Sequence, residues 1–564
     1  MTGAFLLIMS WLLPVHFLPW ISWHNEMLSF SLALLLAWCG LLRMVKKDQS
    51  SNISVPVIAV PWLALGLIAA IQGATGVITF WGDVVVFELY VALCVVCLAL
   101  GFAVARQVPA GSGRCPQRNL NPALTLLAFT LTLGAFASAV VAFAQVFELW
   151  EHSAWINQMP QRRPGANMGQ ANHLATLLLM GMASLLFLYE TSKLKALTST
   201  LIFLMLCAAL AITESRTGVL GFLLLAGWWS VKNKQVGFKV APLVIALAVI
   251  GFLVFFWTWP SLFSFIQQSS GLSAEVNLKA GARLVVWPQL MEAVVQRPWW
   301  GWGLGGVSKA HNAVAHAYVA SEPFSYSHNI LLDLALGLGV PLTAMLVLIT
   351  GVWLLRRIRA ANKLLPWYCL AVTLPVAVHS MLEFPFAYAY FLVPVMLALG
   401  ALEGTVGSQS AMNVGVRPAA AFLLLVSSIA TWSVVEYVAI EEDFRVARFE
   451  ALRMGQTPLG YQRPNIVVLT QLGALLDGAR ISPKPGMTVD ELLTSKNVAL
   501  RYPWTATQNR YALALALNGN PGEAVRQLGV IRAMYGEKTY EKIKADWRNL
   551  AQDQHPQLRD LKLP

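Results

Sequence analysis

A histidine opens one of the apolar stretches of this chain, and polar side chains surround it. The segment Ser325–Asp333 places His328 among serine, tyrosine, asparagine and aspartate residues, directly before the apolar run Leu334–Leu355. A polar group at the mouth of a membrane helix is costly to keep there, so it points to a functional site. A neutral histidine in such a place can act as a general base toward an incoming hydroxyl group.

Three arginines in other connections supply positive charge that suits a phosphate. Arg163 lies in a loop bent by proline and glycine, Arg216 follows Ser215 in a tight turn, and Arg283 precedes an apolar segment. Guanidinium groups bind phosphate in a bidentate manner and keep their charge at any working pH. The surrounding loops hold no Asp-x-Asp motif and no paired carboxylates. We therefore expect a site for a lipid-linked phosphate or pyrophosphate that needs no metal ion.

Further polar residues in the same connections are candidates to line this site. Gln170 and Asn172 lie in the Arg163 loop, Asn329 follows the central histidine, and Glu383 follows His379 by four residues. The spacing of four residues puts the side chains of His379 and Glu383 on one helical face if the helix continues to residue 383. A lone arginine or histidine at a helix end often has only a structural role. The combination of these residues favours a site.

The composition predicts an all-α polytopic membrane protein. The chain has 564 residues, of which 57% are hydrophobic and 12% charged, and its mean hydropathy is +0.60. Soluble domains carry about 25% charged residues. We predict about thirteen spans, each long enough to cross a bilayer core of roughly 30 Å: 4–21, 27–43, 56–74, 84–105, 122–148, 172–189, 196–213, 215–231, 240–258, 328–355, 365–381, 386–403 and 418–437. The first lacks a basic leader and a small-residue cleavage site, so we expect a retained helix.

The basic residues indicate the orientation of these spans. Lysine and arginine are concentrated on one side, in alternate connections: Arg43, Lys46, Lys47, Arg106, Arg114, Arg118, Lys193, Lys195, Lys232, Lys234, Lys239, Arg356, Arg357, Arg359, Lys363 and Arg417. The positive-inside rule places this side, and the N-terminus, in the cytoplasm. The same bias explains the net charge of +12 without a nucleic-acid partner. Only a turn at 213–215 separates two spans, and joining them would reverse every later connection, so we keep them separate.

This topology predicts a transmembrane catalytic domain over residues 1–437 and a helical domain over 438–564. The second domain and the loops 149–171 and 259–327 fall on the outer, periplasmic face. Within the tail, two helical patterns joined by a short turn resemble one tetratricopeptide unit. Such a pair either packs on itself or offers a surface for an acceptor. The pair Cys94 and Cys97 lies in an apolar run without a nearby histidine, so we expect neither a zinc site nor a disulfide.

Several motifs together resemble a known superfamily. Ser327-His328-Asn329 opens an apolar helix and is followed by Gly337-Leu338-Gly339-Val340-Pro341. This pattern resembles the Wzy/WaaL superfamily of O-antigen ligases, O-antigen polymerases and bacterial O-linked oligosaccharyltransferases, as do the turns at 213–218 and 297–303. The segments 163–174 and 379–391 are similar to its protein-glycosylating branch, the PglL/PilO-like enzymes. Many relatives have tyrosine where this chain has Phe384, and Tyr388 or Tyr390 is then a candidate to supply that phenol.

The resemblance implies a GT-C-like fold and an inverting, metal-independent glycosyltransferase that needs no cofactor. Its donor would be a glycan on undecaprenyl pyrophosphate in the bacterial inner membrane. Its acceptor would be a serine or threonine of an exported protein, such as a pilin. The alternatives are an O-antigen ligase that transfers glycan to lipid A-core, or an O-antigen polymerase. A transporter is a more remote alternative, because it would place charges in mid-span.

These expectations assign a role to each candidate residue. We predict that Arg216 and Arg283 hold the pyrophosphate, and that Arg163 is a third cation. His328 accepts the proton of the acceptor hydroxyl or positions that hydroxyl. The remaining candidates are expected to bind substrate or to orient the imidazole: Gln170, Asn172, Asn329, Glu383 and Tyr388.

Overall fold

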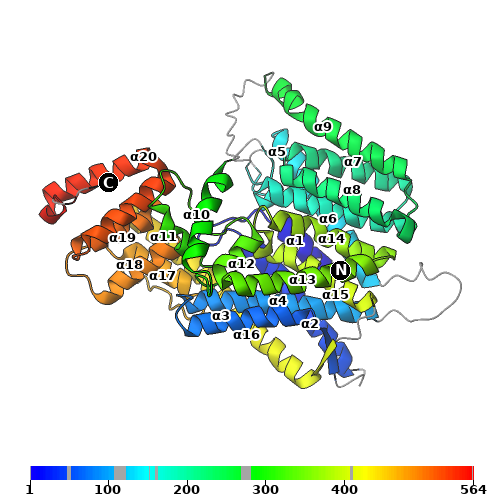
Figure 1. The fold of residues 1–564 in the computed structure, drawn as a ribbon, viewed down its shortest axis with the longest axis horizontal. Helices are drawn as coiled ribbons and strands as arrows, with labels where there is room; N and C mark the ends of the chain where they lie inside the picture. Colours follow the sequence, from blue (N-terminus) through cyan, green and yellow to red (C-terminus); the bar gives the residue numbers. More distant parts are fainter. Residues whose placement is uncertain are drawn as a thin grey trace. The chain divides into compact units, whose positions relative to one another are not determined.

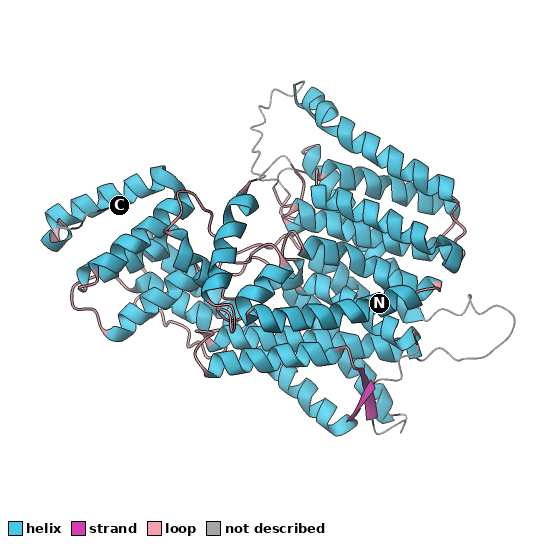
Figure 2. Cartoon of the chain, viewed as in Figure 1, coloured by secondary structure: helices cyan, strands magenta, loops and turns pink. Residues whose placement is uncertain are grey.

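Helices make up nearly all of the regular secondary structure of the described residues, as the composition predicts (Figures 1 and 2). The computed structural model describes residues 2–46, 52–106, 122–150, 153–158, 163–268, 281–406, 411–559, 561 and 563. Lys47, Arg114 and Arg118 of the basic connections, and parts of the loops 149–171 and 259–327, lie outside the described residues. One small antiparallel sheet, which the sequence did not predict, pairs β1 (Asn52–Pro56) with β2 (Ala411–Gly415).

The chain forms two compact units, each assembled from three segments. Unit 1 consists of Met1–Leu63, Tyr90–Asn277 and Thr350–Ser427, and unit 2 of Ala64–Leu89, Leu278–Ile349 and Ser428–Pro564. Four of the five boundaries fall inside helices: α3 (Ala59–Ala74), α4 (Trp81–Arg106), α13 (Val340–Ala360) and α16 (Val416–Ala451). The other helices of unit 1 are α1 (Thr2–Leu12), α2 (Trp23–Lys46), α5 (Pro122–Val146), η1 (Ala166–Met168), α6 (Ala171–Glu190), α7 (Ala196–Ile212), α8 (Arg216–Val236), α9 (Pro242–Gln268), α14 (Leu364–Ser380), η2 (Pro385–Ala387) and α15 (Ala389–Thr405). Those of unit 2 are α10 (Ala282–Gln296), α11 (Val307–Ala315), α12 (Ile330–Leu338), α17 (Thr470–Arg480), α18 (Val489–Arg501), α19 (Thr505–Leu517), α20 (Pro521–Asp553) and η3 (Pro556–Leu558).

Many of these helices are apolar enough for a membrane protein. Among the described residues, seven are long enough to cross a bilayer: Trp23–Val45, Trp81–Arg106, Pro122–Val146, Ala171–Glu190, Pro242–Phe265, Val340–Ala360 and Val416–Ala451. Five further apolar helices, α1, α3, α7, α14 and α15, are shorter. The chain is therefore a multi-pass membrane protein, whereas the thirteen crossings and their orientation stay predictions.

The first predicted span, 4–21, is wrong as a continuous helix. Helix α1 ends at Leu12, and α2 begins only at Trp23. Pro14 lacks the N–H group that would continue the helical ladder, and its ring disfavours the helical conformation of the residue before it. The chain therefore leaves the helix before it reaches the length of a full span.

The predicted span 328–355 is also wrong as one helix, because it breaks between α12 and α13. Gly339 has a φ of +81°, which interrupts the helical backbone. The N–H of Val340 donates to the carbonyl of Pro298 at 2.7 Å instead of to its own helix. Pro341 has no N–H to donate at all. The break therefore separates the short helix after His328 from the long apolar helix α13.

The carbonyl groups that this break releases find other partners within unit 2. Leu336 accepts a hydrogen bond from the N–H of Trp302 at 2.6 Å. Gly337 accepts one from the side-chain amide of Gln72 at 2.9 Å. A buried carbonyl without a partner is costly, so these two contacts make the break stable.

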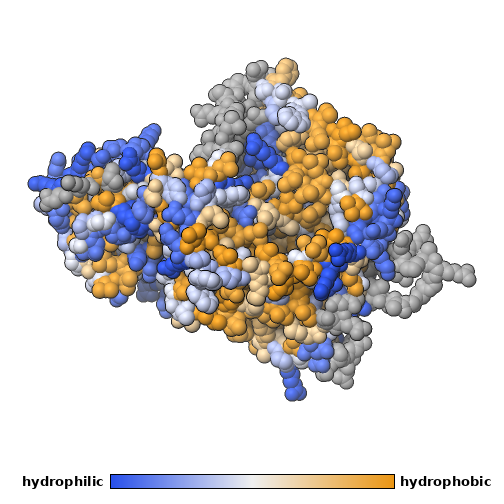
Figure 3. Space-filling view, in the orientation of Figure 1, coloured by the Kyte–Doolittle hydropathy of each residue, from blue (hydrophilic) through white to orange (hydrophobic). Residues whose placement is uncertain are grey.

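Unit 1 is built around α6, which is buried nearly all round and packs against α5, α7, α8 and α14. Elsewhere α4 and α15 approach closely at Gly101 and Gly400, where a Cβ atom would collide with the facing backbone at Leu397 and Leu98. Small residues allow this kind of contact between membrane helices. The surface over α7 to α9 is largely hydrophobic, whereas the surface over α18 to α20 is largely hydrophilic (Figure 3).

The C-terminal part of unit 2 contains the helix pair that the sequence predicts. Helices α19 and α20 pack together through buried residues that include Ala512, Ala524 and Leu528, which confirms the helix–turn–helix interpretation. The buried carboxylate of Glu436 on α16 accepts hydrogen bonds from the backbone N–H groups of residues 467–469 at 2.8–3.0 Å. These groups lie at the N-terminus of α17, where a negative charge is favourable.

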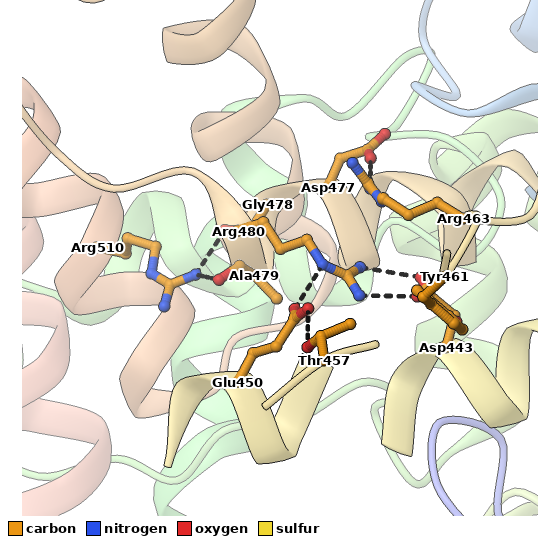
Figure 4. Close-up of polar contacts among 10 residues, drawn as sticks. All are labelled: Asp443, Glu450, Thr457, Tyr461, Arg463, Asp477, Gly478, Ala479, Arg480 and Arg510. Atoms are coloured by element: carbon orange, nitrogen blue, oxygen red, sulfur yellow. Dashed lines mark hydrogen bonds and ion pairs between the residues drawn. The ribbon is translucent and has the colours of Figure 1, made fainter. Parts of the chain in front are cut away.

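A charged network joins the end of α16 to α17 (Figure 4). Arg480 donates two hydrogen bonds to Asp443 at 2.7 and 2.9 Å and a third to Glu450 at 2.8 Å. Arg463 pairs with Asp477 beside a hollow of about 400 Å³. Because each of these guanidinium groups is paired with a carboxylate of the same unit, we interpret the network as structural.

The break before α13 can be tested by a substitution at its glycine. A Cβ at position 339 would collide with the Trp299 carbonyl, and an alanine there would have to adopt an unfavourable positive φ. We therefore expect Gly339→Ala to lower the free energy of unfolding by about 1–3 kcal/mol, measured by thermal unfolding in detergent. Gly351→Ala is the matched control, because a Cβ there meets no atom within 4 Å and alanine favours a helix. Equal unfolding temperatures for the two variants would contradict this account of the break.

Candidate active site

The Arg163 loop in unit 1 is held in place by backbone geometry and by a buried amide. A Cβ on Gly165 would collide with the backbone of Gln170, so the loop closes tightly there. The side chain of Gln145 on α5 accepts from the N–H of Ala166 at 2.9 Å and donates to its carbonyl at 3.1 Å. The loop is thereby fixed at the N-terminus of α6, where Gln170 is half-buried as the residue before the helix.

Asn167 makes further contacts that fix the same loop. Its side-chain amide donates to the carbonyls of Leu12 and Trp155, both at 2.7 Å. Its side-chain oxygen accepts from the N–H of Asn157 at 3.1 Å, and a ring nitrogen of His16 lies 2.6 Å from its backbone carbonyl. Residues near the end of α1 therefore help to shape this candidate site, which the sequence did not indicate.

Asn172 is the junction between three segments of unit 1. Its Oδ1 accepts from Arg163 Nη2 at 3.2 Å and from Ser215 Oγ at 2.7 Å. Its Nδ2 donates to Glu383 Oε1 at 3.3 Å. The structure thus brings together three of the predicted residues. Because both ends of the amide already bind protein groups, the geometry favours a positioning role over direct substrate binding.

The turn that carries Arg216 has the arrangement that the sequence predicts. Ser215 caps α8, and its hydroxyl accepts from the N–H of Gly218 at 3.0 Å. Arg216 is the first residue of α8, and its side chain is exposed. Arg163 Nε donates to the carbonyl of Thr213 in the same turn at 2.8 Å. The two arginines therefore belong to one hydrogen-bonded group of loops.

Glu383 is buried just beyond the end of α14. The helix ends at Ser380, but the N–H of Glu383 still donates to the carbonyl of His379 at 2.8 Å. The imidazole of His379 is fully buried, and its Nδ1 lies 2.7 Å from the hydroxyl of Thr176 on α6. The histidine therefore ties α14 to α6, and the carboxylate reaches the Asn172 junction.

Aromatic residues surround the start of α15. Tyr388 is half-buried, and its ring lies 4.6 Å from the His173 ring and 5.8 Å from Phe384. Tyr390 is 3% exposed, and its hydroxyl lies 3.2 Å from His173 Nδ1. Of the two phenols that the sequence offered, Tyr388 is the more accessible one.

In unit 2, His328 lies in a strained turn that a buried carboxylate stabilises. His328 has a φ of +61°, a conformation that is uncommon outside glycine and that persists where neighbouring contacts enforce it. The hydroxyl of Ser327 donates to Asp333 at 2.7 Å, and its N–H donates to the same carboxylate at 3.2 Å. The imidazole is half-buried and lies 4.6 Å from the ring of Phe324.

Asn329 caps the helix that follows. Its Oδ1 accepts from the N–H groups of Leu331 and Leu332 at 3.0 and 3.1 Å. This is the usual contact of an asparagine N-cap, and it orients α12. The oxygen is thus used by the fold, and a contact between Asn329 and substrate stays a prediction.

Arg283 belongs to the helix that contacts the His328 turn. Trp287 on α10 donates its ring N–H to the carbonyl of Ser327 at 2.7 Å. Arg283 lies four residues before Trp287, so the two side chains share one face of α10. Unit 2 therefore brings the Arg283 helix against the segment that carries the candidate base.

Burial raises the pKa of Asp333 to about 6, although its hydrogen bonds from Ser327 lower it. The helix α12 lies outside the candidate spans. The carboxylate that stabilises the His328 turn is thus only moderately stable in its charged form.

Among the described residues, no group of three or more His, Cys, Asp or Glu side chains is placed to hold a metal ion.

Comparisons with known families match three stretches of the chain. Residues 201–347 match the family described as O-antigen ligase, and residues 164–189 match the family described as protein glycosylation ligase. Residues 367–550 match the C-terminal region of a family described as virulence factor membrane-bound polymerase. The chain is thus a multi-pass membrane protein that is similar, over these stretches, to membrane-bound ligases and polymerases of glycans. The matches also confirm the resemblance to the Wzy/WaaL superfamily and its protein-glycosylating branch.

Two relatives, both from Acinetobacter baylyi, extend this result. The chain is 24% identical to a general O-oligosaccharyltransferase over 546 residues, which cover 94% of this chain and 91% of that protein. It is 30% identical to a ComP-specific O-oligosaccharyltransferase over 288 residues, about half of each chain. Eight of the nine predicted site residues lie within the stretches that match the families, and Arg163 directly precedes one of these stretches.

Four residues that shape the candidate site were not assigned by the sequence analysis. Gln145 is a polar residue in an apolar run, and Asn167 lies inside the Arg163 loop, so both carried a weak signal. Asp333 belongs to the polar segment around the histidine, but nothing in the spacing pairs it with Ser327. Trp287 gave no signal, because its contact depends on how α10 packs.

The junction at Asn172 predicts a loss of stability when its side chain is removed. In Asn172→Ala, Arg163, Ser215 and Glu383 each lose one hydrogen-bond partner, so we expect a destabilisation of about 1–3 kcal/mol. Thermal unfolding in detergent measures this effect. Thr130→Ala on the neighbouring helix α5 is the control, because the hydroxyl of Thr130 donates within its own helix to the carbonyl of Leu126 at 2.8 Å. If both variants unfold with the wild type, the junction does not hold the loops together.

The raised pKa of Asp333 predicts a pH-dependent difference in stability. The carboxyl has a higher pKa folded, about 6, than its ordinary value of 3.8, so the folded state binds more protons between these values. Its contribution to stability is therefore largest at acid pH and falls as the pH rises to about 6. We expect the unfolding temperature of wild type minus that of Asp333→Asn to decrease from pH 4.5 to pH 7. The same pH scan with His328→Ala tests whether the nearby imidazole contributes to this difference in unfolding temperature. A constant difference across this range would contradict the assignment.

Proposed function

We propose that this protein is an O-linked oligosaccharyltransferase that transfers a glycan from a lipid pyrophosphate to a serine or threonine of an exported protein. The observation that carries the proposal is that the O-antigen ligase match includes Arg216, Arg283 and His328 together. These are the residues that the sequence alone assigned to a phosphate-bearing donor and a hydroxyl acceptor. The carrier is undecaprenyl pyrophosphate in the bacterial inner membrane, and the site faces the periplasm.

The chemistry requires the arginines to stabilise the leaving group. The acceptor oxygen forms a bond to the anomeric carbon while the bond between that carbon and the pyrophosphate oxygen breaks, with inversion. Negative charge then accumulates on the lipid pyrophosphate. Arg216 and Arg283 bind this charge, with Arg163 as a third cation, and do so without a metal ion. Preorganised positive groups of this kind lower the barrier because they stabilise charge that develops in the transition state.

His328 is the group that receives or directs the acceptor proton. The acceptor hydroxyl must lose one proton as its oxygen attacks, and a neutral imidazole can accept it. The strained backbone at His328 supports this role, because φ values of this kind cluster at functional sites. Ser327, Asp333 and Asn329 hold the turn and so determine where the imidazole points.

The choice of acceptor distinguishes this proposal from its nearest alternative. An O-antigen ligase would use the same donor chemistry but would transfer the glycan to lipid A-core, and a polymerase would transfer it to another glycan. The protein glycosylation ligase match covers Gln170 at the end of the loop and Asn172 in the first turn of α6. The relatives of similar sequence are named as O-oligosaccharyltransferases, and one aligns over nearly the whole chain. Both observations favour a protein acceptor, such as a pilin.

An assay with purified components tests the proposal directly. The enzyme in detergent is mixed with a glycan on undecaprenyl pyrophosphate and with a candidate pilin, and intact mass spectrometry follows the pilin. We expect a mass increase equal to one glycan unit. Arg216→Ala and Arg283→Ala should each lower the rate on the order of 10²–10³-fold, and His328→Ala on the order of 10²–10⁴-fold.

Arg356→Ala is the matched control for the loss of an arginine, because Arg356 is exposed at the far end of α13. We expect this variant to keep wild-type activity. Transfer to lipid A-core but not to protein would show the ligase activity instead. Near wild-type transfer by His328→Ala would exclude the imidazole as the base.

A further inference from the structure

We propose that the outer face of α10 contacts lipid chains at the surface of the bilayer. This face, here called the α10 stripe, consists of exposed residues at helical spacing: Leu284, Pro288, Met291 and Val295. The three side chains other than proline are 76%, 54% and 73% exposed. Their spacing of four, three and four residues places them along one line of the helix.

The opposite face of α10 is already occupied by protein. Val286, Leu290 and Ala293 are fully buried in a core that includes residues of α11 and α12. Ordinary surface helices are apolar on one face and polar on the other. Because α10 is apolar on both, its second apolar face requires an environment other than water.

The end of the α10 stripe is bonded to the start of a candidate membrane span. The chain continues from α10 into Trp299 and Trp300, which are 69% and 78% exposed. The N–H of Val340, the first residue of α13, donates to the carbonyl of Pro298 at 2.7 Å. The two tryptophans are therefore fixed at the N-terminal end of α13.

The first half of α13 presents a lipid-like surface at the same place. Val340, Met345 and Leu348 are 47%, 49% and 66% exposed. A span of this composition must face lipid along its exposed side. The α10 stripe and the tryptophans are thus continuous, through a direct hydrogen bond, with a surface that already faces the bilayer.

The types of residue around the α10 stripe favour a lipid surface over a protein partner. Tryptophan is enriched where a membrane meets water. Arg283 lies in the first turn of α10, where a guanidinium group can reach lipid headgroups while its stem stays among apolar atoms. Arg297, at the other end, lies over the ring of Trp302 at 4.2 Å and is therefore held by the protein. Helices with an apolar face of this kind lie in the plane of the interface, with that face among the acyl chains.

This placement adds a depth to the proposed chemistry and in that respect rests on the proposed function. If α10 lies in the interface, Arg283 in its first turn is held at the level of the headgroups. A lipid-linked pyrophosphate lies at the same level. The α10 stripe would therefore set the height at which one of the two phosphate-binding arginines meets the donor.

Spin labels in lipid nanodiscs test the placement without any need for turnover. A variant with all six cysteines replaced receives a single cysteine at Met291 or Val295 and a nitroxide label. Leu348→Cys on α13 serves as the lipid-facing control and Gln552→Cys on α20, which is exposed, as the water-facing control. Accessibility to oxygen and to a water-soluble nickel complex is measured for each. Only samples that elute as a single species and match the unlabelled chain in thermal unfolding are compared.

We expect the labels at 291 and 295 to resemble the label at 348, with high access to oxygen and at least several-fold lower access to nickel than at 552. Labels that resemble position 552 would overturn the proposal, because the α10 stripe would then face water. Low access to both reagents would also overturn it, since this would show a protein partner on the α10 stripe. A chain that passes this test but transfers no glycan would contradict the proposed function alone.

Discussion

Polar groups inside a largely apolar chain must be paired within the protein, and both parts of the candidate site depend on this constraint. A buried carbonyl or amide that has no partner costs about 1–3 kcal/mol, because it has lost its hydrogen bonds to water. The break before α13 is possible only because Trp302 and Gln72 bind the carbonyls that it releases. The same requirement applies to the half-buried amide of Asn172, which bonds at both of its ends.

These contacts order a different set of candidate residues in each unit. Unit 1 holds Arg163, Arg216 and Glu383 on loops that share one asparagine. Unit 2 holds His328 in a turn stabilised by Asp333 and places the Arg283 helix against that turn through Trp287. Unit 1 therefore orders candidate cations around Asn172, and unit 2 orders a candidate cation and a candidate base around one turn.

The predictions from the sequence were strongest where a residue type implies its chemistry. The order of polar and apolar residues placed Arg216 in a tight turn at a helix start and His328 at the mouth of an apolar run, and both were found in these local settings. Asn172 and Asn329 were expected to bind substrate, but their side-chain oxygens are used by the fold. An amide has the same hydrogen-bonding groups in either role, so only its neighbours distinguish the two.

The sequence by itself determined the helical class, the membrane character, the apolar helices and the residues suited to phosphate chemistry, because hydropathy and side-chain chemistry are local properties. It also contained the prolines and the glycine that end α1 and divide the helix after His328, but their effect was visible only in the structure. The tertiary structure decided which distant groups pair, such as Gln72 with Gly337 and Trp287 with Ser327. The physical reason is that such partners are selected by packing between elements far apart in the chain, and no local pattern records that packing.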